Sequence, residues 1–124
     1  MRIYAVKTFM RFARKERITA ESLIEAVRRI ESGLIDAELG GSLVKQRVAR
    51  TGEGRSGGYR TIVAVRKGDR HVFLFGFAKN ERDHIETSDL AALKALGKVY
   101  LSISDAELGS ALGAAILEEI DAHA

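Results

Sequence analysis

The spacing of apolar and polar residues predicts a strand and then a helix at the start of the chain. Residues 2–10 are rich in β-branched and aromatic side chains, which is typical of a short strand. Thr19 is a residue type that caps the N-terminus of a helix. Apolar residues then recur at helical spacing, at Leu23, Ile24, Val27 and Ile30. Gly33 is a typical C-terminal stop and should end this helix.

Three further segments follow the two-residue period of strands after a loop over residues 33–42. They are residues 42–50, 59–67 and 71–79. The tight turn Gly68-Asp69 joins the last two, which therefore predict a hairpin. The final strand is apolar on both faces, so we expect it to lie centrally in the sheet, with Phe73, Phe75 and Phe77 in the core.

The C-terminal third returns to helical spacing. Thr87 or Ser88 should cap a helix that carries Leu90, Leu93, Leu96, Val99 and Tyr100. Ser104 should cap a last helix over residues 104–122, with Leu108, Leu112, Ile116 and Ile120 on one face. This order of elements predicts an α+β fold. We expect one domain over residues 1–124, a small antiparallel sheet packed against an N-terminal helix and C-terminal helices.

Charge is distributed unevenly along the chain, although the net formal charge is only +3. Residues 42–82 contain ten Lys and Arg against three Asp and Glu, a net of +7. Residues 83–124 contain two against eight, a net of −6. A basic middle segment is typical of contact with a polyanion such as RNA, although a solvated, arginine-rich sheet face has the same composition.

The composition excludes several classes of protein. There is no cysteine, so disulfides, thiolate metal sites and cysteine nucleophiles are ruled out. No apolar run approaches the roughly 20 residues that span a bilayer, and the N-terminus lacks the features of a secretory signal. We therefore expect a cytoplasmic protein without membrane contact. The acidic residues show no metal-ligand spacing, so neither a metal nor another cofactor is expected.

The candidate chemistry is a group of basic residues at the ends of the predicted strands. Lys45 and Arg47 share one face of their strand, and Arg60 begins the next. Lys79 ends the last strand, and Arg55 lies in the loop between the first two. Because one antiparallel strand starts where its neighbour ends, these side chains should converge at one end of the sheet. Such a cluster binds phosphates and stabilises charge that develops on phosphorus oxygens.

The histidines and one tyrosine have competing interpretations. His71, His84 and His123 are expected to be exposed polar groups, since no convincing catalytic pair is present. Tyr59 either stacks on an RNA base or packs on the sheet, and we favour packing.

Four segments resemble the RelE-type toxins of type II toxin–antitoxin modules, in particular their HigB-like branch. They are Gly33-Leu-Ile-Asp-Ala-Glu-Leu-Gly-Gly41, Lys45-Gln-Arg-Val-Ala-Arg50, Gly54-Arg-Ser-Gly-Gly-Tyr-Arg-Thr61 and Phe75-Gly-Phe-Ala-Lys-Asn-Glu-Arg82. The third and fourth segments are the most specific. The resemblance covers roughly residues 1–100 and leaves out the last helix, which would then be an appendage.

The resemblance implies a RelE-like fold and a metal-independent endoribonuclease that cuts mRNA on the ribosome. The substrate 2′-OH would attack the adjacent phosphate and leave a 2′,3′-cyclic phosphate and a free 5′-OH. It also implies an antitoxin partner, often with a helix-turn-helix domain, through which alone the pair would contact DNA.

Carried over by position, the resemblance implies that Arg60 neutralises the scissile phosphate and that Lys79 stabilises the transition state or transfers a proton. The other implied site residues hold flanking phosphates, orient these groups or contact RNA: Lys45, Glu81, Arg47, Arg50, Arg55, Asn80 and Tyr59. Many relatives also carry a tyrosine or histidine near the end of the sheet. Here only Tyr100 and His123 are available, and neither lies in a matching motif.

Two alternatives stay open. A ParE-like toxin of the same superfamily would inhibit DNA gyrase without cutting RNA, because a fold does not fix a function. A catalytically inactive RNA- or protein-binding module would explain the missing proton-transfer residue. Because acidic residues beside an RNA site would repel the substrate, we expect Glu118, Glu119 and Asp121 to point away from the basic face.

Overall fold

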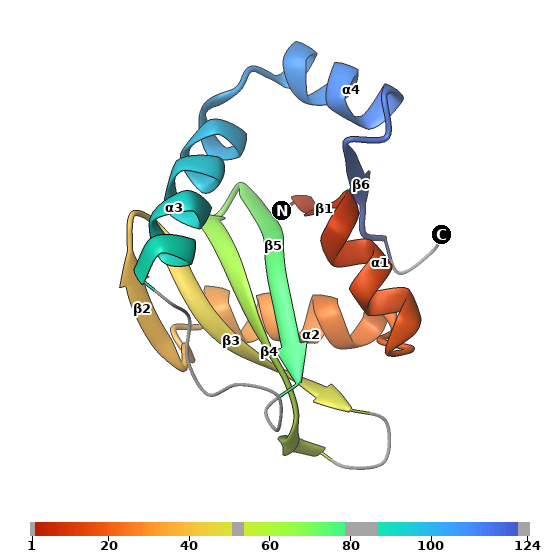
Figure 1. Ribbon diagram of the computed structural model, residues 1–124, viewed down its shortest axis with the longest axis vertical. Helices are drawn as coiled ribbons and strands as arrows, with labels where there is room; N and C mark the ends of the chain where they lie inside the picture. Colours follow the sequence, from red (N-terminus) through yellow and green to blue (C-terminus); the bar gives the residue numbers. More distant parts are fainter. Residues whose placement is uncertain (1, 51–53, 79–86, 122–124) are drawn as a thin grey trace.

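The computed structural model describes residues 2–50, 54–78 and 87–121, apart from the side chains of residues 50 and 54–57. Within these ranges, six strands form one sheet in the order β2-β3-β4-β5-β1-β6 (Figure 1). The strands are β1 (Arg2–Val6), β2 (Ala37–Gly40), β3 (Leu43–Arg50), β4 (Gly54–Arg66), β5 (Arg70–Ala78) and β6 (Leu117–Glu119). The helices are α1 (Lys7–Lys15), α2 (Ala20–Glu31), α3 (Thr87–Ser102) and α4 (Asp105–Gly113). The predicted α+β class is confirmed.

Most neighbouring strands are antiparallel, as predicted, and the hairpin of β4 and β5 is confirmed. β1 differs, because it pairs parallel to β5, with Tyr4 opposite Val72. A parallel pair needs a long connection, which the chain from α1 to β4 provides. β2 also lies inside the segment that was predicted to be a loop over residues 33–42. The sheet is therefore mixed and larger than the sequence indicated.

The first strand is shorter than predicted. It ends at Val6, and residues up to Lys15 form α1, so the strand over residues 2–10 is wrong in its second half. Phe9 and Ala13 are both buried and are four residues apart, which is helical spacing. Over so few residues, the β-branched and aromatic side chains of residues 2–10 favoured a strand more strongly than the helical spacing favoured a helix.

The two faces of the sheet are covered by different helices. Gln46 of β3 is buried and donates hydrogen bonds to the carbonyl oxygens of Ala26 in α2, at 3.4 Å, and of Leu34 just beyond it, at 2.9 Å. Leu43 of the same strand lies against Gly97 of α3. Odd and even side chains of a strand point to opposite faces, so α2 and α3 lie on opposite sides of the sheet (Figure 1).

Helix caps occur where the sequence predicts them. Thr19 Oγ1 accepts a hydrogen bond from the backbone N–H of Ser22 at 3.1 Å, and Gly33 follows α2 with a φ of 84°. Ser104 Oγ accepts from the N–H of Glu107 at 3.1 Å, while the Glu107 carboxylate accepts from the N–H of Ser104 at 2.9 Å. This reciprocal capping box fixes the start of α4. The Ser104 N–H also lowers the pKa of Glu107.

The C-terminal segment is not the predicted helix over residues 104–122. α4 ends at Gly113, and β6 then pairs antiparallel with β1. Leu117 is 1% exposed, whereas Ile116, which the helical pattern assigned to the buried face, is 50% exposed. Pairing with β6 satisfies the backbone N–H and C=O groups on the edge of β1. The spacing of apolar residues within the C-terminal segment does not indicate this pairing, because the partner strand lies at the other end of the chain. The end of this segment is therefore part of the sheet.

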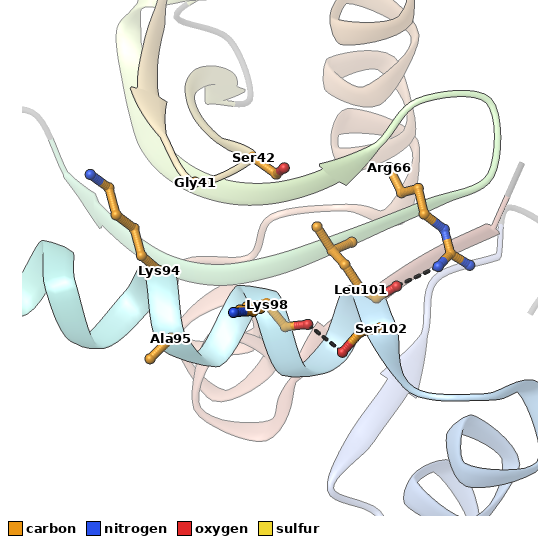
Figure 2. Close-up of a pocket in the computed structure, with 8 residues that line it drawn as sticks. All are labelled: Gly41, Ser42, Arg66, Lys94, Ala95, Lys98, Leu101 and Ser102. Carbon is orange, nitrogen blue, oxygen red and sulfur yellow. Dashed lines mark hydrogen bonds between the residues drawn. The ribbon is translucent and has the colours of Figure 1, made fainter.

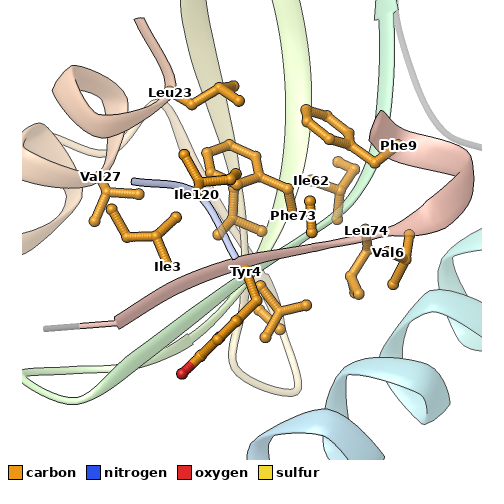
Figure 3. Close-up of a cluster of buried hydrophobic side chains, with 14 of the residues drawn as sticks. Ile3, Tyr4, Val6, Phe9, Leu23, Val27, Ile62, Phe73, Leu74 and Ile120 are labelled. Atoms are coloured by element: carbon orange, nitrogen blue, oxygen red, sulfur yellow. The ribbon is translucent and has the colours of Figure 1, made fainter. Parts of the chain in front are cut away.

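The main core lies between the sheet and the helices α1 and α2. The rings of Phe9 and Phe73 stack with centroids 5.0 Å apart. Figure 3 shows Ile120, from the end of the chain, among the same buried side chains as Leu23 and Val27. β5 is buried along most of its length, which confirms its predicted central position. In the described part of the chain, no helix is long and apolar enough to cross a membrane.

Candidate functional site

The strand register brings the predicted basic residues of β3 and β4 onto one face. Arg47 pairs with Arg60, and Arg60 pairs with Phe77 of β5, so the three form a row across the sheet. Lys45 belongs to the adjacent row, which continues with Ile62 and Phe75. Opposed residues of antiparallel strands share a face, with Cβ atoms roughly 4.5–5.5 Å apart. We call the side of the sheet that carries Lys45, Arg47, Arg60, Phe75 and Phe77 the basic face.

Arg47 is held in place by an acidic residue that sequence reasoning missed. The Arg47 Nε lies 3.6 Å from Asp36 Oδ2, and the Arg47 backbone N–H donates to the same oxygen at 2.6 Å. The Arg29 guanidinium donates to the Arg47 carbonyl oxygen. The Arg47 side chain still exposes 44% of its surface. No local pattern connects residues 36 and 47, because β3 brings them together only when it pairs with β2.

Several predicted site residues cannot be placed relative to this row. Lys79, Asn80 and Glu81 lie outside the described residues, and so do the side chains of Arg50 and Arg55. β5 ends at Ala78, which pairs with Tyr59, the neighbour of Arg60. The described part of the predicted site is therefore Lys45, Arg47 and Arg60.

Tyr59 does not belong to the basic face. Its side chain is 1% exposed, and its hydroxyl donates to the Glu16 carboxylate at 3.0 Å. The Phe12 ring of α1 meets it edge-on, with centroids 5.7 Å apart. Since Arg60 points to one face of β4, its neighbour Tyr59 must point to the other. The favoured interpretation of packing is confirmed, and the assignment of Tyr59 to RNA binding is wrong.

Phe75 and Phe77 lie on the side of the sheet that carries the basic residues, and Phe77 is buried, as predicted. Their ring centroids are 6.0 Å apart, and Phe75 is partly exposed. Phe73, by contrast, stacks on Phe9 on the opposite face. A bulge between Ile62 and Val63 in the pairing with β5 breaks the two-residue period that would have kept all three rings on one face.

His71 is buried, so the prediction of an exposed polar group is wrong. Its Nε2 lies 2.9 Å from Glu31 Oε2 without the alignment of a hydrogen bond. Burial lowers the pKa of His71, and the Glu31 carboxylate opposes that shift only in part. The same carboxylate accepts from the N–H of Gly68 at 3.1 Å. Glu31 therefore joins α2 both to the β4–β5 turn and to the buried His71 of β5.

Hydrogen bonds from Arg70 anchor the C-terminal end of α3 to the sheet. Arg70 is 1% exposed and donates to the carbonyl oxygens of Tyr100 at 2.8 Å and Ile103 at 3.0 Å. Arg70 and Arg2 both reach Asp105 at the start of α4. Hydrogen bonds from Arg2 and Arg66 lower the pKa of Asp69 to about 2. These contacts position α3 over the sheet.

The acidic end of the chain contacts α1, away from the basic face. Glu118 of β6 pairs with Arg14 of α1, and α1 packs on the face opposite the basic face. Among the residues that the structure describes, no three His, Asp or Glu side chains gather as metal ligands would.

The chain matches the model of a known protein family. The family model described as the RelE toxin of the RelE/RelB toxin–antitoxin system matches residues 1–120. The match extends past residue 100 and includes β6, so the resemblance covers more of the chain than the motifs alone indicated. A comparison with curated proteins finds no match.

Proposed function

Because the chain belongs to the RelE toxin family and is therefore a toxin with an antitoxin partner, we propose that it cuts mRNA on the ribosome. The observation that carries this proposal is the row formed by Arg47 and Arg60, with Lys45 in the next row of the same face. Three cations on one face suit a ribose-phosphate chain, whose affinity for proteins comes largely from its phosphates.

The proposed reaction is a transesterification without a metal. The substrate 2′-OH loses its proton and forms a bond to the adjacent phosphorus. The bond from phosphorus to the 5′ oxygen breaks, and that oxygen takes up a proton. The products are a 2′,3′-cyclic phosphate and a free 5′-OH.

Each basic residue has a distinct part in this reaction. Arg60 neutralises the scissile phosphate and the charge that grows on its oxygens in the transition state. Lys45 and Arg47 hold flanking phosphates. Lys79 stabilises the transition state or transfers a proton, Asn80 and Glu81 orient these groups, and Arg50 and Arg55 bind RNA further along the strand. The partly exposed Phe75 offers an aromatic surface on which a base stacks.

The partners follow from the same proposal. The ribosome presents the mRNA, and the antitoxin covers the toxin and carries a helix-turn-helix domain for operator DNA. Membership of the HigB-like branch stays a prediction.

Expression of the chain in bacteria, with the ends of cellular transcripts mapped, tests the proposal. We expect growth arrest together with new mRNA ends that carry 2′,3′-cyclic phosphate. Growth arrest with intact transcripts would overturn it. Gyrase–DNA cleavage complexes would then favour a ParE-like inhibitor, and a chain without toxicity would favour an inactive binding module.

A further inference from the structure

A second basic site lies where α3 crosses the β2–β3 turn and the end of β4. A cavity of about 730 Å³ opens there, within the range of roughly 300–1,000 Å³ that is typical of ligand pockets. Its walls are the turn residues Gly41 and Ser42, Arg66 of β4, and the side chains of α3 (Figure 2). The cavity is at the opposite end of β3 from Arg47, roughly 17 Å away at the rise of a strand.

Two lysines of α3 line this cavity. Lys94 and Lys98 are the only Lys or Arg residues between positions 83 and 124. They are four residues apart, so their side chains are neighbours on the helix, and like charges at this spacing are unfavourable. No acidic residue lies three or four positions from either lysine. Within the described ranges, no ion pair involves either one. An anionic ligand would remove the repulsion between them.

The β2–β3 turn fits the Lys94 side chain closely. Gly40 and Gly41 have φ values of 83° and 59°, which favour glycine. A Cβ at Gly41 would lie 3.1 Å from Lys94 Cγ, and one at Gly40 would lie 3.3 Å from Lys94 Nζ. The aliphatic part of Lys94 therefore packs on the turn, and its ammonium group is held beside it. A positioned cation loses less side-chain entropy on binding a ligand.

The third cation of the cavity already has partners. Arg66 donates to the Leu101 carbonyl oxygen (Figure 2). It also pairs with Asp69, which in turn pairs with Arg2. Arg66 thus fixes the wall of the cavity, and the charge available to a ligand comes from the two lysines. The apolar side chains of Ala95 and Leu101 line the same cavity. This combination of cations and apolar surface suits a ligand that has both an anionic and an uncharged part.

We propose that this cavity binds the phosphate of a nucleotide, with Lys94 and Lys98 as the phosphate ligands. The nucleotide is either free or one unit of an RNA strand. An acidic peptide would also be attracted to the two lysines, but a cavity with apolar walls fits a ribose and base better than a carboxylate side chain. The site is separate from the basic face and does not depend on RNA cleavage.

Titrations of the purified full chain, followed by amide NMR, test the proposal. The probes are adenosine 5′-monophosphate, inorganic phosphate and a single-stranded RNA whose 2′-O-methyl groups prevent cleavage. We expect shifts at Gly41, Ser42, Lys94 and Lys98. The variant K94M/K98M keeps the aliphatic stems and removes both charges, so it should bind at least about tenfold more weakly. For the RNA, the slope of log affinity against log salt concentration should be smaller in magnitude for the variant than for the parent chain. The expected difference is roughly 0.7, the value for one phosphate contact on a single strand.

The matched control is Lys7→Met, which removes one exposed charge on α1 and should leave affinity unchanged. Shifts with the mononucleotide identify a free nucleotide as the ligand, whereas shifts with the RNA alone identify a unit of a strand. The proposal is overturned if neither nucleotide probe shifts these amides, or if K94M/K98M binds them as tightly as the parent chain. It is also overturned if only a polyglutamate peptide shifts them. If the chain binds the nucleotide but cuts no RNA, the proposed function is overturned and the proposed nucleotide site is not.

Discussion

Arg47 and Arg60 lie directly opposite each other on β3 and β4, although like charges at such positions destabilise a sheet. The Asp36 carboxylate beside Arg47 offsets part of this repulsion. A phosphate between the two guanidinium groups would offset more of it, because each can donate two hydrogen bonds to phosphate oxygens. The register of one strand pair thus brings two cations together at this end of the sheet, as the proposed function requires.

Arg60→Ala should abolish toxicity. Loss of one group that stabilises the transition state reduces the rate by about 10²–10³-fold. Growth after induction measures toxicity, and a thermal unfolding curve of the purified variant shows whether it is still folded. Arg47→Ala is the comparison, and because it removes only a flanking contact we expect a smaller loss, roughly tenfold. A folded Arg60→Ala variant with full toxicity would contradict the assignment.

Tyr59→Phe should retain toxicity and lose stability. The substitution removes the hydroxyl that donates to Glu16, a hydrogen bond that contributes about 1 kcal/mol to the free energy of unfolding. Urea unfolding of the variant measures this loss, and the growth assay measures toxicity. Reduced toxicity at unchanged stability would mean that Tyr59 does contact RNA.

Stability should fall as the pH is lowered from about 7.5 to 5.5. The pKa of His71 is lowered in the folded state, so the unfolded chain, with a pKa of about 6.5, takes up a proton that the folded chain does not. The stabilisation is present above that pH and is lost below it. Asp69, Asp105 and Glu107 have lowered pKa values, so their contribution is lost only in more acidic solution.

His71→Gln isolates this effect, because it removes the titrating group. Urea unfolding at both pH values should show a smaller pH dependence for the variant than for the parent chain, whatever its absolute stability. An identical pH dependence in the two proteins would assign the effect to other groups.

The same substitution at two glycines should have opposite effects. A Cβ at Gly76 would lie 2.6 Å from a ring carbon of Phe12, so Gly76→Ala should destabilise the fold by about 1–3 kcal/mol. A Cβ at Gly109 meets nothing within 4 Å, and Gly109→Ala should stabilise α4 by about 0.5–1 kcal/mol. Thermal unfolding compares the stabilities of the two variants. A change of the same sign in both would mean that a Cβ at Gly76 does not clash with Phe12.

Arg70→Met should destabilise the chain by about 3 kcal/mol. The substitution leaves the carbonyl oxygens of Tyr100 and Ile103 without their buried donor. Arg28→Met on the exposed face of α2 is the matched control and should change stability by no more than about 0.5 kcal/mol. Similar unfolding free energies for the two variants would mean that Arg70 does not anchor α3.

The sequence by itself determined the features that depend on neighbouring residues. Thr19 and Ser104 cap helices because their hydroxyls reach N–H groups three residues away. The alternation of strands assigned Lys45 and Arg47 to one face, because side chains two residues apart on a strand point the same way. The same alternation separates Tyr59 from Arg60.

Only the tertiary structure decided the contacts between segments that are distant in the chain. β6 pairs with β1 across more than 100 residues, and this pairing overrides a helical pattern at Ile116 and Ile120. Asp36 meets Arg47 through strand pairing. His71 is buried because β5 lies at the centre of the sheet, where Glu31 approaches it. Such contacts depend on burial and on the satisfaction of backbone hydrogen bonds over the whole fold, which no short window of sequence contains.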